Sequence, residues 1–180
     1  MNEKSSRKNI EVELERTFLL KEMPEGIEDY KSIEILDIYF PLSIPHPILR
    51  LRKKGNLLTL TKKSPIENDS SVQEEQTIML SEKEYIELSK IPGKRLRKVR
   101  YYYPFGKRLT EIDVFLDDLE GLVLVDFEFD FVKEKEEFPI PDFCLADVTQ
   151  EEAIAGGFLA GKKYADIESF LGKHSYEKIN

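Results

Sequence analysis

Charged and apolar residues alternate along most of the segments of this sequence that can form strands. Residues 10–20 read I-E-V-E-L-E-R-T-F-L-L, so Glu11, Glu13 and Glu15 alternate with apolar residues. Successive side chains of a strand point to opposite faces, and the three carboxylates therefore share one face. Two interpretations remain open for such a face. It is either a solvated surface, or it looks into a cavity that holds a cation or opposing Lys and Arg side chains.

The same alternation recurs in the other predicted strands and favours the second interpretation. If the strands close into a barrel, the charged faces can line a lumen while the apolar faces are covered from outside. The lumen then has one acidic and one basic bank. The acidic bank is Glu11, Glu13, Glu15, Glu111, Asp113, Asp126 and Glu128, and the basic bank is Arg50, Arg52, Lys63, Lys98 and Arg100. Carboxylates suit Mg²⁺ or Mn²⁺, and Arg and Lys suit phosphate oxygens, so the two banks together favour metal-assisted phosphoryl chemistry.

Lys62 and Lys63 are neighbours, and only one of them can face the lumen. Lys63 shares its strand parity with Thr59 and Thr61, which places it in the basic bank unless a bulge intervenes.

The predicted elements are strands at 10–20, 33–40, 48–53, 57–63, 72–80, 96–104, 109–116 and 122–133, a polar loop at 64–71, and helices that start at Ser81, at Asp147 or Thr149, and at 162.

Length and composition limit the classes of protein that need to be considered. A chain of 180 residues favours one domain with a real core, and no apolar run is long enough to span a bilayer. The net charge of −8 argues against general affinity for nucleic acid. Cys144 has no second cysteine to pair with, which fits a reducing cytoplasm. We therefore expect a cytoplasmic protein, monomeric or homodimeric, whose partner is an anionic small molecule.

At this level of detail the sequence resembles the CYTH domain, also called the triphosphate tunnel metalloenzyme family. The resemblance rests on short motifs that occur in the family's order over most of the chain. They are V-E-L-E-R-T-F-L-L at 12–20, R-L-R at 50–52, L-T-K-K at 60–63, Glu75 before Leu80-Ser81, R-K-V-R-Y at 97–101, E-I-D-V-F at 111–115 and V-D-F-E-F at 125–129.

The resemblance implies an α+β fold, a closed eight-stranded antiparallel β-barrel that forms a tunnel with helices packed outside. It implies one tunnel domain at 10–172 between tails at 1–9 and 173–180. The implied reaction is metal-dependent hydrolysis of a triphosphate, with Mg²⁺ or Mn²⁺ as cofactor. The implied metal ligands are Glu13, Glu15, Asp113, Asp126 and Glu128. The implied catalytic residues are Glu13, Glu15, Lys98 and Arg100, and the implied substrate-binding residues are Arg50, Arg52, Lys63, Glu75, Lys98, Arg100 and Lys162.

One departure from the family pattern affects the expected activity. The family's N-terminal signature is Glu-x-Glu-x-Lys, and this sequence has Thr17 in place of the lysine. A hydroxyl can bind phosphate but carries no charge. Inorganic triphosphate is the first choice of substrate, and thiamine triphosphatase and adenylyl cyclase activities of the family are alternatives. A protein that binds polyphosphate or a nucleotide without turnover is the alternative from another class.

Overall fold

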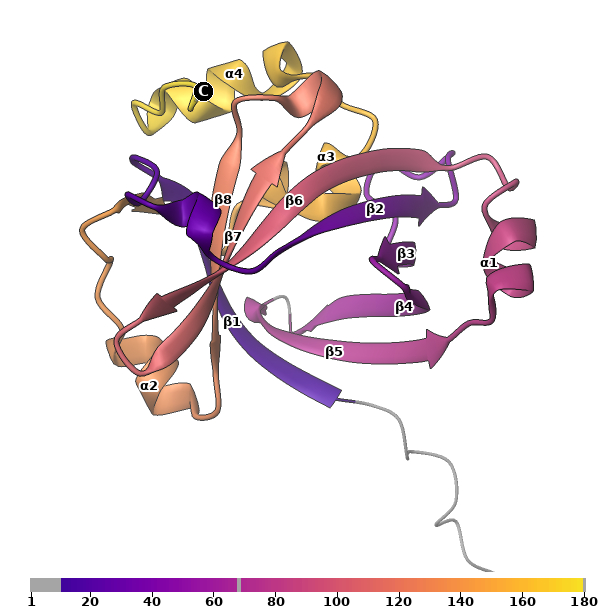
Figure 1. Ribbon diagram of the computed structural model, residues 1–180, viewed down its shortest axis with the longest axis horizontal. Helices are drawn as coiled ribbons and strands as arrows, with labels where there is room; N and C mark the ends of the chain where they lie inside the picture. The colour runs from indigo at the N-terminus through magenta and orange to yellow at the C-terminus, as the bar shows by residue number, and fades with distance from the viewer. Residues whose placement is uncertain (1–10, 68, 180) are drawn as a thin grey trace, which may run out of the picture.

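The computed structural model describes residues 11–67 and 69–179, and of Glu11 it describes only the backbone. Nine strands form one antiparallel sheet, and the first eight close into a barrel because β5 pairs with β1 (Figure 1). The predicted α+β barrel is therefore confirmed. The strands of the barrel are β1 (Glu11–Leu20), β2 (Ser32–Phe40), β3 (Leu49–Lys54), β4 (Leu57–Ile66), β5 (Asp69–Met79), β6 (Lys94–Phe105), β7 (Arg108–Phe115) and β8 (Val123–Phe129).

The barrel closes on β1, whose two edges have different partners. One edge pairs with β8 along residues 14–19. The other edge pairs with β5 along residues 11–14 and then with the short ninth strand, β9 (Cys144–Asp147), along residues 18–20. The strand that carries the acidic run is thus held on both sides, which fixes the direction of its side chains.

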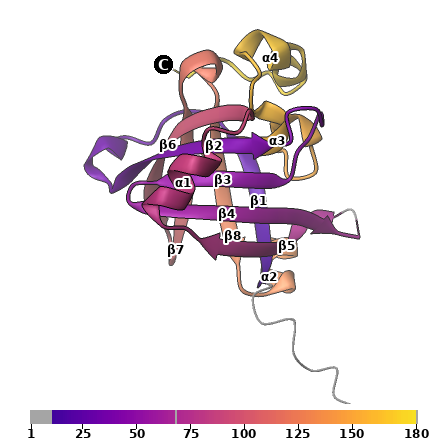
Figure 2. The ribbon, with the colours of Figure 1, turned by 90° about the vertical axis from the view of Figure 1, so that its right-hand side faces the viewer.

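The helices fall into two groups. α1 (Glu82–Leu88) covers the outer side of β2, β3 and β4, where Tyr85 and Leu88 pack on a buried apolar cluster, and α2 (Val132–Glu137) lies outside β1 and β8. α3 (Gly156–Leu159) and α4 (Tyr164–Lys173) pack at one end of the barrel (Figures 1 and 2). Ser81 forms the expected capping box with Glu84. α1 and α2 therefore pack against the outside of the barrel wall, as expected, whereas α3 and α4 cover one end of the barrel.

The core is divided between the two faces of the barrel wall. The outer cluster contains Phe18, Val125 and Phe127 and is covered by the segment around Phe138. The inner cluster lies at the end closed by α3 and α4. Its strand residues include Leu19, Leu96, Phe115 and Leu124, and it continues into Leu159, Tyr164, Ile167, Leu171 and Tyr176. Burial of both clusters supplies the main favourable free energy of folding.

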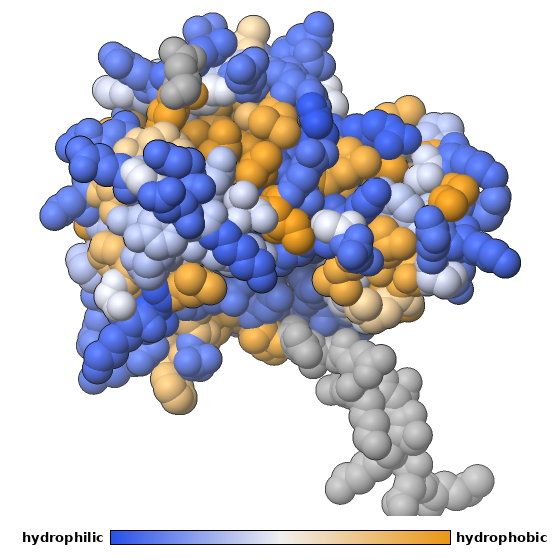
Figure 3. Space-filling model, viewed as in Figure 1, coloured by the Kyte–Doolittle hydropathy of each residue, from blue (hydrophilic) through white to orange (hydrophobic). Residues whose placement is uncertain are grey.

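Tyr176 belongs to the segment that was expected as a C-terminal tail. Its hydroxyl accepts a hydrogen bond from the Val123 amide and donates one to the Gly121 carbonyl. The expected tail at 1–9 lies outside the described residues. In the described part of the chain, no helix is both long enough and apolar enough to cross a membrane. On the face seen in Figure 3, apolar residues are interspersed with hydrophilic ones.

Three expected elements differ from the structure. The loop predicted at 64–71 is mostly strand, because β4 continues to Ile66 and β5 starts at Asp69. The strand predicted at 122–133 ends at Phe129 and is followed by α2. No helix starts at Asp147 or Thr149. The carboxylate of Asp147 accepts the Thr149 amide, which is the local bond of a turn, and the next helical residues are a 3₁₀ turn at Glu152–Ile154.

The first of these errors has a simple physical cause. Segment 64–71 contains Ser64, Pro65 and Ser70, residues that are usual in loops. Inside a barrel with a polar lumen, however, polar residues occupy inward positions of a strand. Pro65 lies beside a register shift between β4 and β5, where one backbone donor is not needed.

Candidate active site

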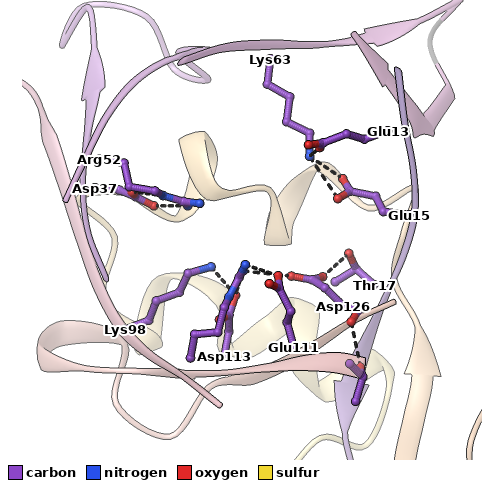
Figure 4. Close-up of polar contacts among 12 residues, drawn as sticks. Glu13, Glu15, Thr17, Asp37, Arg52, Lys63, Lys98, Glu111, Asp113 and Asp126 are labelled. Atoms are coloured by element: carbon purple, nitrogen blue, oxygen red, sulfur yellow. Dashed lines mark hydrogen bonds and ion pairs between the residues drawn. The ribbon is translucent and has the colours of Figure 1, made fainter. Parts of the chain in front are cut away.

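A cavity of about 670 Å³ lies inside the barrel and is lined by side chains of all eight barrel strands, most of them charged. Figure 4 shows these side chains pointing into a common central space, with Lys63 across from Lys98 and Asp113. The predicted residues that line the cavity are Glu13, Glu15, Arg50, Arg52, Lys63, Glu75, Lys98, Arg100, Glu111, Asp113, Asp126 and Glu128. The alternation of charge along the strands therefore located the lumen correctly.

Lys63 links the basic strand β4 to the acidic strand β1. Its Nζ lies 2.8 Å from Glu13 Oε2 and donates to both carboxylate oxygens of Glu15, at 3.0 and 3.1 Å. Burial alone would lower the pKa of Lys63, but the negative charges of Glu15 and Glu13 outweigh it and raise that pKa. Lys62 is exposed on the other face, so the assignment of Lys63 to the lumen is confirmed.

The most buried charges of the site surround Asp113, whose side chain is 1% exposed. Its carboxylate accepts hydrogen bonds from Arg100, with Nε at 2.7 Å from Oδ1 and an Nη at 2.6 Å from Oδ2, and a further one from Lys98. Burial would raise the pKa of Asp113, but Lys98 and Arg100 together hold it well below its usual range. Asp113 is therefore fully engaged by two cations and holds them in place.

The pKa of Lys98 is lowered, in contrast to that of Lys63. Burial and the nearby guanidinium groups of Arg100 and Arg52 lower its pKa, and the attraction of Asp113 only partly offsets them. A buried ammonium with other cations around it gains from any additional anion that enters the cavity. Lys98 thus has the electrostatic environment of an anion-binding group.

Two arginines on β3 differ in how they are held. The guanidinium of Arg52 makes two hydrogen bonds to Asp37, at 2.7 and 2.8 Å, and Asp37 is completely buried. Arg50 forms no ion pair among the described residues, and its buried Nε has no hydrogen-bond partner there. Arg50 lines the cavity, so its positive charge, which no carboxylate of the described residues pairs with, can act on an anionic ligand there.

On the opposite wall, two carboxylates lack sufficient compensating charge. Burial, followed by repulsion from Asp113 and Glu15, raises the pKa of Asp126 to about 6. Burial and then Glu111, Glu13 and Glu15 raise the pKa of Glu128. Raised carboxyl pKa values in a cavity indicate negative charge that an additional cation would relieve.

Thr17 lies on the inner face, as expected, and its environment is now clear. Its hydroxyl donates a hydrogen bond of 2.7 Å to Asp126 Oδ1, and its backbone amide donates to Thr149 Oγ1 at 3.0 Å. The position therefore supplies one neutral donor to Asp126 and no positive charge. Arg16 points to the other face and pairs with Asp147, so it does not replace the missing lysine.

The donor set suits a hard divalent cation, because it consists of carboxylate oxygens without soft ligands. Within residues 11–67 and 69–179, no three His, Cys, Asp or Glu side chains already converge as a metal-binding group. Lys63 holds Glu13 and Glu15 together, and Glu128 forms no ion pair in the described part of the chain. A cation would therefore need Lys63 to move, while Asp126 and Glu128 already carry excess negative charge.

Two predicted residues are not placed in the cavity. Lys162 does not line it, and its ammonium lies over the ring of Phe158, 5.1 Å from the ring centre. This residue comes from the segment between α3 and α4, which packs against the closed end of the barrel. The side chain of Glu11 lies outside the described residues.

Other lining residues were not predicted from the sequence. Tyr39, His46, Lys54 and Gln73 all line the cavity, and Gln73 donates to Glu15 Oε1 at 3.0 Å. Lys54 continues the parity of Arg50 and Arg52, so its position could have been found by extending the pattern by two residues. His46 comes from a proline-rich loop, and no sequence periodicity indicates where such a loop will pack.

Comparisons with known proteins agree with this geometry. The chain is 31% identical over 151 residues to the inorganic triphosphatase of Nitrosomonas europaea. The aligned region covers 82% of this chain and 96% of that protein. No model of a known protein family matches the sequence.

Solved structures give the same indication. A crystal structure of an inorganic triphosphatase superimposes with a TM-score of 0.61 and 27% identity, over 83% of this chain and 95% of that one. A proposed adenylate cyclase of Bacillus halodurans has a TM-score of 0.54 at 14% identity, over 96% of this chain and 94% of that one. The second likeness shows a shared fold alone.

Proposed function

Since this chain belongs to the same family as the inorganic triphosphatase of Nitrosomonas europaea, we propose that it hydrolyses a triphosphate in its barrel cavity. The observation that carries this proposal is the pairing of two opposed features in one cavity. Arg50 is a cation at the cavity with no ion-pair partner in the described part of the chain, whereas Asp126 and Glu128 hold excess negative charge. A phosphate chain would pair with Arg50, and a divalent cation would neutralise the excess negative charge of Asp126 and Glu128. The motifs quoted above further support assignment to the CYTH branch of such proteins.

The basic residues of the cavity differ in whether a carboxylate holds them in place. Arg50 has no carboxylate partner in the described part of the chain, whereas Lys98 and Arg100 are fixed by Asp113 and Arg52 is fixed by Asp37. Fixed donors need no rearrangement as charge develops on the transferred phosphoryl group, and this favours the transition state over the ground state. Lys63 would leave Glu13 and Glu15 to contact phosphate when a metal takes its place.

Glu13, Glu15 and Glu128, supported by Asp126, would hold Mg²⁺ or Mn²⁺. Such an ion, when bound, neutralises charge on phosphate oxygens and acidifies an attacking water. A carboxylate of the lumen then accepts the proton of that water. Glu128 is the candidate for this task because it lines the cavity and forms no ion pair in the described part of the chain, and both holding a cation and accepting a proton require its ionised carboxylate.

Inorganic triphosphate is the proposed first substrate, with thiamine triphosphate and nucleoside triphosphates as alternatives. The second candidate function is binding of the same anions without turnover. Thr17 favours it, because the hydroxyl beside Asp126 contributes no positive charge where the family signature has a lysine.

The decisive experiment is a phosphate-release assay with each of these substrates, with Mg²⁺, with Mn²⁺ and with a chelator. We expect metal-dependent release from the wild type. Glu128→Gln should lower turnover by at least a factor of 10², a typical contribution of acid–base catalysis, and remain folded. Its melting temperature without metal should be equal or higher, because a repelled charge is lost.

Glu136→Gln is the matched control, since Glu136 is an exposed carboxylate on α2 outside the barrel. It should behave as the wild type does. Triphosphate that binds tightly in calorimetry but is never hydrolysed would favour the second function. Full activity of Glu128→Gln would remove Glu128 from the reaction.

A further inference from the structure

Three side chains that have no role in the proposed triphosphate site form a basic cluster around an aromatic ring. The ammonium of Lys54 lies 5.4 Å and that of Lys31 5.6 Å from the ring centre of Tyr102. Both distances are those of a cation–π contact. We call Lys31, Lys54 and Tyr102 the rim cluster.

The strand register places the rim cluster on the inner face of the wall. Tyr102 follows Lys98 and Arg100 at alternate positions of β6, and it lies opposite Glu111 of β7. The amide of Tyr102 donates to the Lys31 carbonyl at 2.9 Å, which aligns Lys31 with it. Tyr101 and Tyr103, with the other parity, pack in the outer apolar cluster. The rim cluster therefore lies beyond Arg100, on the side away from the end closed by α3 and α4, and Lys54 is its member that lines the cavity.

Lys54 connects the rim cluster to the phosphate-binding residues. It lines the cavity and occupies the third of three alternate positions on β3, after Arg50 and Arg52. Alternate residues of a strand are about 6.6 Å apart, so the three cations extend over roughly 13 Å. This row is longer than a chain of three phosphates.

The charge of the rim cluster is not neutralised by the protein. Neither Lys31 nor Lys54 forms an ion pair with any residue in the part of the chain that the structure describes. Glu111 is the carboxylate opposite Tyr102, and it is paired with Arg100. Two ammonium groups held near one ring repel each other, and an anion bound close to them would relieve that repulsion.

We propose that the rim cluster binds the phosphate groups beyond the third of a linear polyphosphate longer than triphosphate. This inference rests on the proposed function, because it takes Arg50 and Arg52 to hold the inner phosphates. An aromatic base is a less suitable occupant, since the ring of Tyr102 already carries two ammonium groups that the base would have to displace. The cluster thus adds a subsite that distinguishes long chains from short ones.

Calorimetric titration tests the subsite directly. Inorganic triphosphate, inorganic tetraphosphate, a size-selected longer linear polyphosphate and ATP are titrated in the presence of a chelator, so that no hydrolysis interferes. The double variant Lys31→Ala/Lys54→Ala should lose about tenfold in affinity for the two longer chains, the combined size of two partly exposed charge pairs. The ratio of its affinities for tetraphosphate and triphosphate should fall by nearly the same factor.

Lys53→Ala is the matched control, because Lys53 is the neighbour of Lys54 and is exposed on the outer face of β3. It removes the same charge from the protein and should leave every affinity unchanged.

Several results would overturn the inference. An equal loss for triphosphate and the longer chains would make the lysines part of a general electrostatic attraction. A loss confined to ATP would assign the rim cluster to an organic group. No loss for any ligand would remove it from binding. Failure of the proposed hydrolysis is a separate result, since it would appear as absent phosphate release from triphosphate by the wild type.

Discussion

The two halves of the barrel interior are built by the same strands, yet one is charged and the other is apolar. Along β1 the inward positions run from Glu15 through Thr17 to Leu19, and along β6 they run from Arg100 through Lys98 to Leu96. The change from charge to hydrocarbon takes two to four residues in each strand. α3 and α4 cover the apolar half, and the cavity occupies the charged half and reaches the apolar half at Leu96, Phe115 and Leu124.

The difference shows how stability and function are separated within one wall. The apolar half buries mainly hydrocarbon, and the hydroxyl of Tyr176 has its partners in Val123 and Gly121, so burial there favours folding. The charged half contains carboxylates with raised pKa values beside arginines that need partners, and such groups cost free energy in the absence of a ligand. The closed end can therefore hold the barrel together while the charged half remains poised for an anion and a cation.

The largest expected effect comes from a charge that is structural despite its place in the charged half. Asp113→Ala should destabilise the protein by about 3–5 kcal/mol, because it leaves Lys98 and Arg100 buried without their common partner. Urea denaturation at neutral pH measures the change. Glu87→Ala, which breaks an exposed pair with Lys90 on the surface, should show no measurable loss. A loss as small for Asp113→Ala would mean that water or ions readily replace this carboxylate.

Much of this division could be predicted from the sequence. Alternation along each strand identified the inward charges, and parity alone chose Lys63 over Lys62, because a period of two has no other solution without a bulge. The same reasoning placed Thr17 in the lumen. These features depend on neighbours in sequence, which is why a strand pattern carries them.

Features set by distant segments were not predicted. Asp113 was expected to bind metal, but the number of cations that surround it depends on the pairing of β6 with β7. Asp37 was missed because a single inward aspartate resembles any surface residue until Arg52 is placed beside it. Lys162 was expected at the site through resemblance alone, and the packing of α3 and α4 places it elsewhere.

A smaller effect should be visible in the pH dependence of stability without metal. The pKa of Asp126 is raised from 3.8 to about 6, so its protonated form favours folding. Its contribution is fully present below pH 3.8 and is lost as the pH rises through about 6. Asp126→Asn should therefore be more stable than the wild type at pH 7.5, by about 2–3 kcal/mol.

The advantage of Asp126→Asn should disappear at pH 4, where the wild-type carboxyl is mostly protonated. Thermal unfolding of both proteins in a chelator, at several pH values, gives the difference directly. Carboxylates whose pKa is lowered, such as Asp37, act in both proteins and cancel. A stability difference between the two proteins that stays constant across this pH range would show that the pKa of Asp126 is not raised in the folded protein.

The smallest expected effect concerns Thr17, the neutral residue where the charged half meets the apolar half. Thr17→Lys would place an ammonium beside Asp126, where a hydroxyl now donates to Oδ1, and its longer side chain would reach the cavity. The added cation should lower the raised pKa of Asp126 and attract the phosphate chain. We expect tighter triphosphate binding or faster turnover of roughly tenfold, or about 1.4 kcal/mol.

Thr17→Met separates charge from size, since methionine has similar length and no charge. If both variants gain equally, filling of the cavity and not the ammonium is responsible. If Thr17→Lys stays folded but binds and hydrolyses triphosphate no better than the wild type, the new ammonium pairs with Asp126 and adds nothing to the phosphate binding by Arg50 and Lys98. If both variants unfold more easily, position 17 is too closely packed for a longer side chain, since Thr17 is only 9% exposed and its amide is bound to Thr149. The charged half would then end at Glu15, one inward position earlier than the cavity suggests.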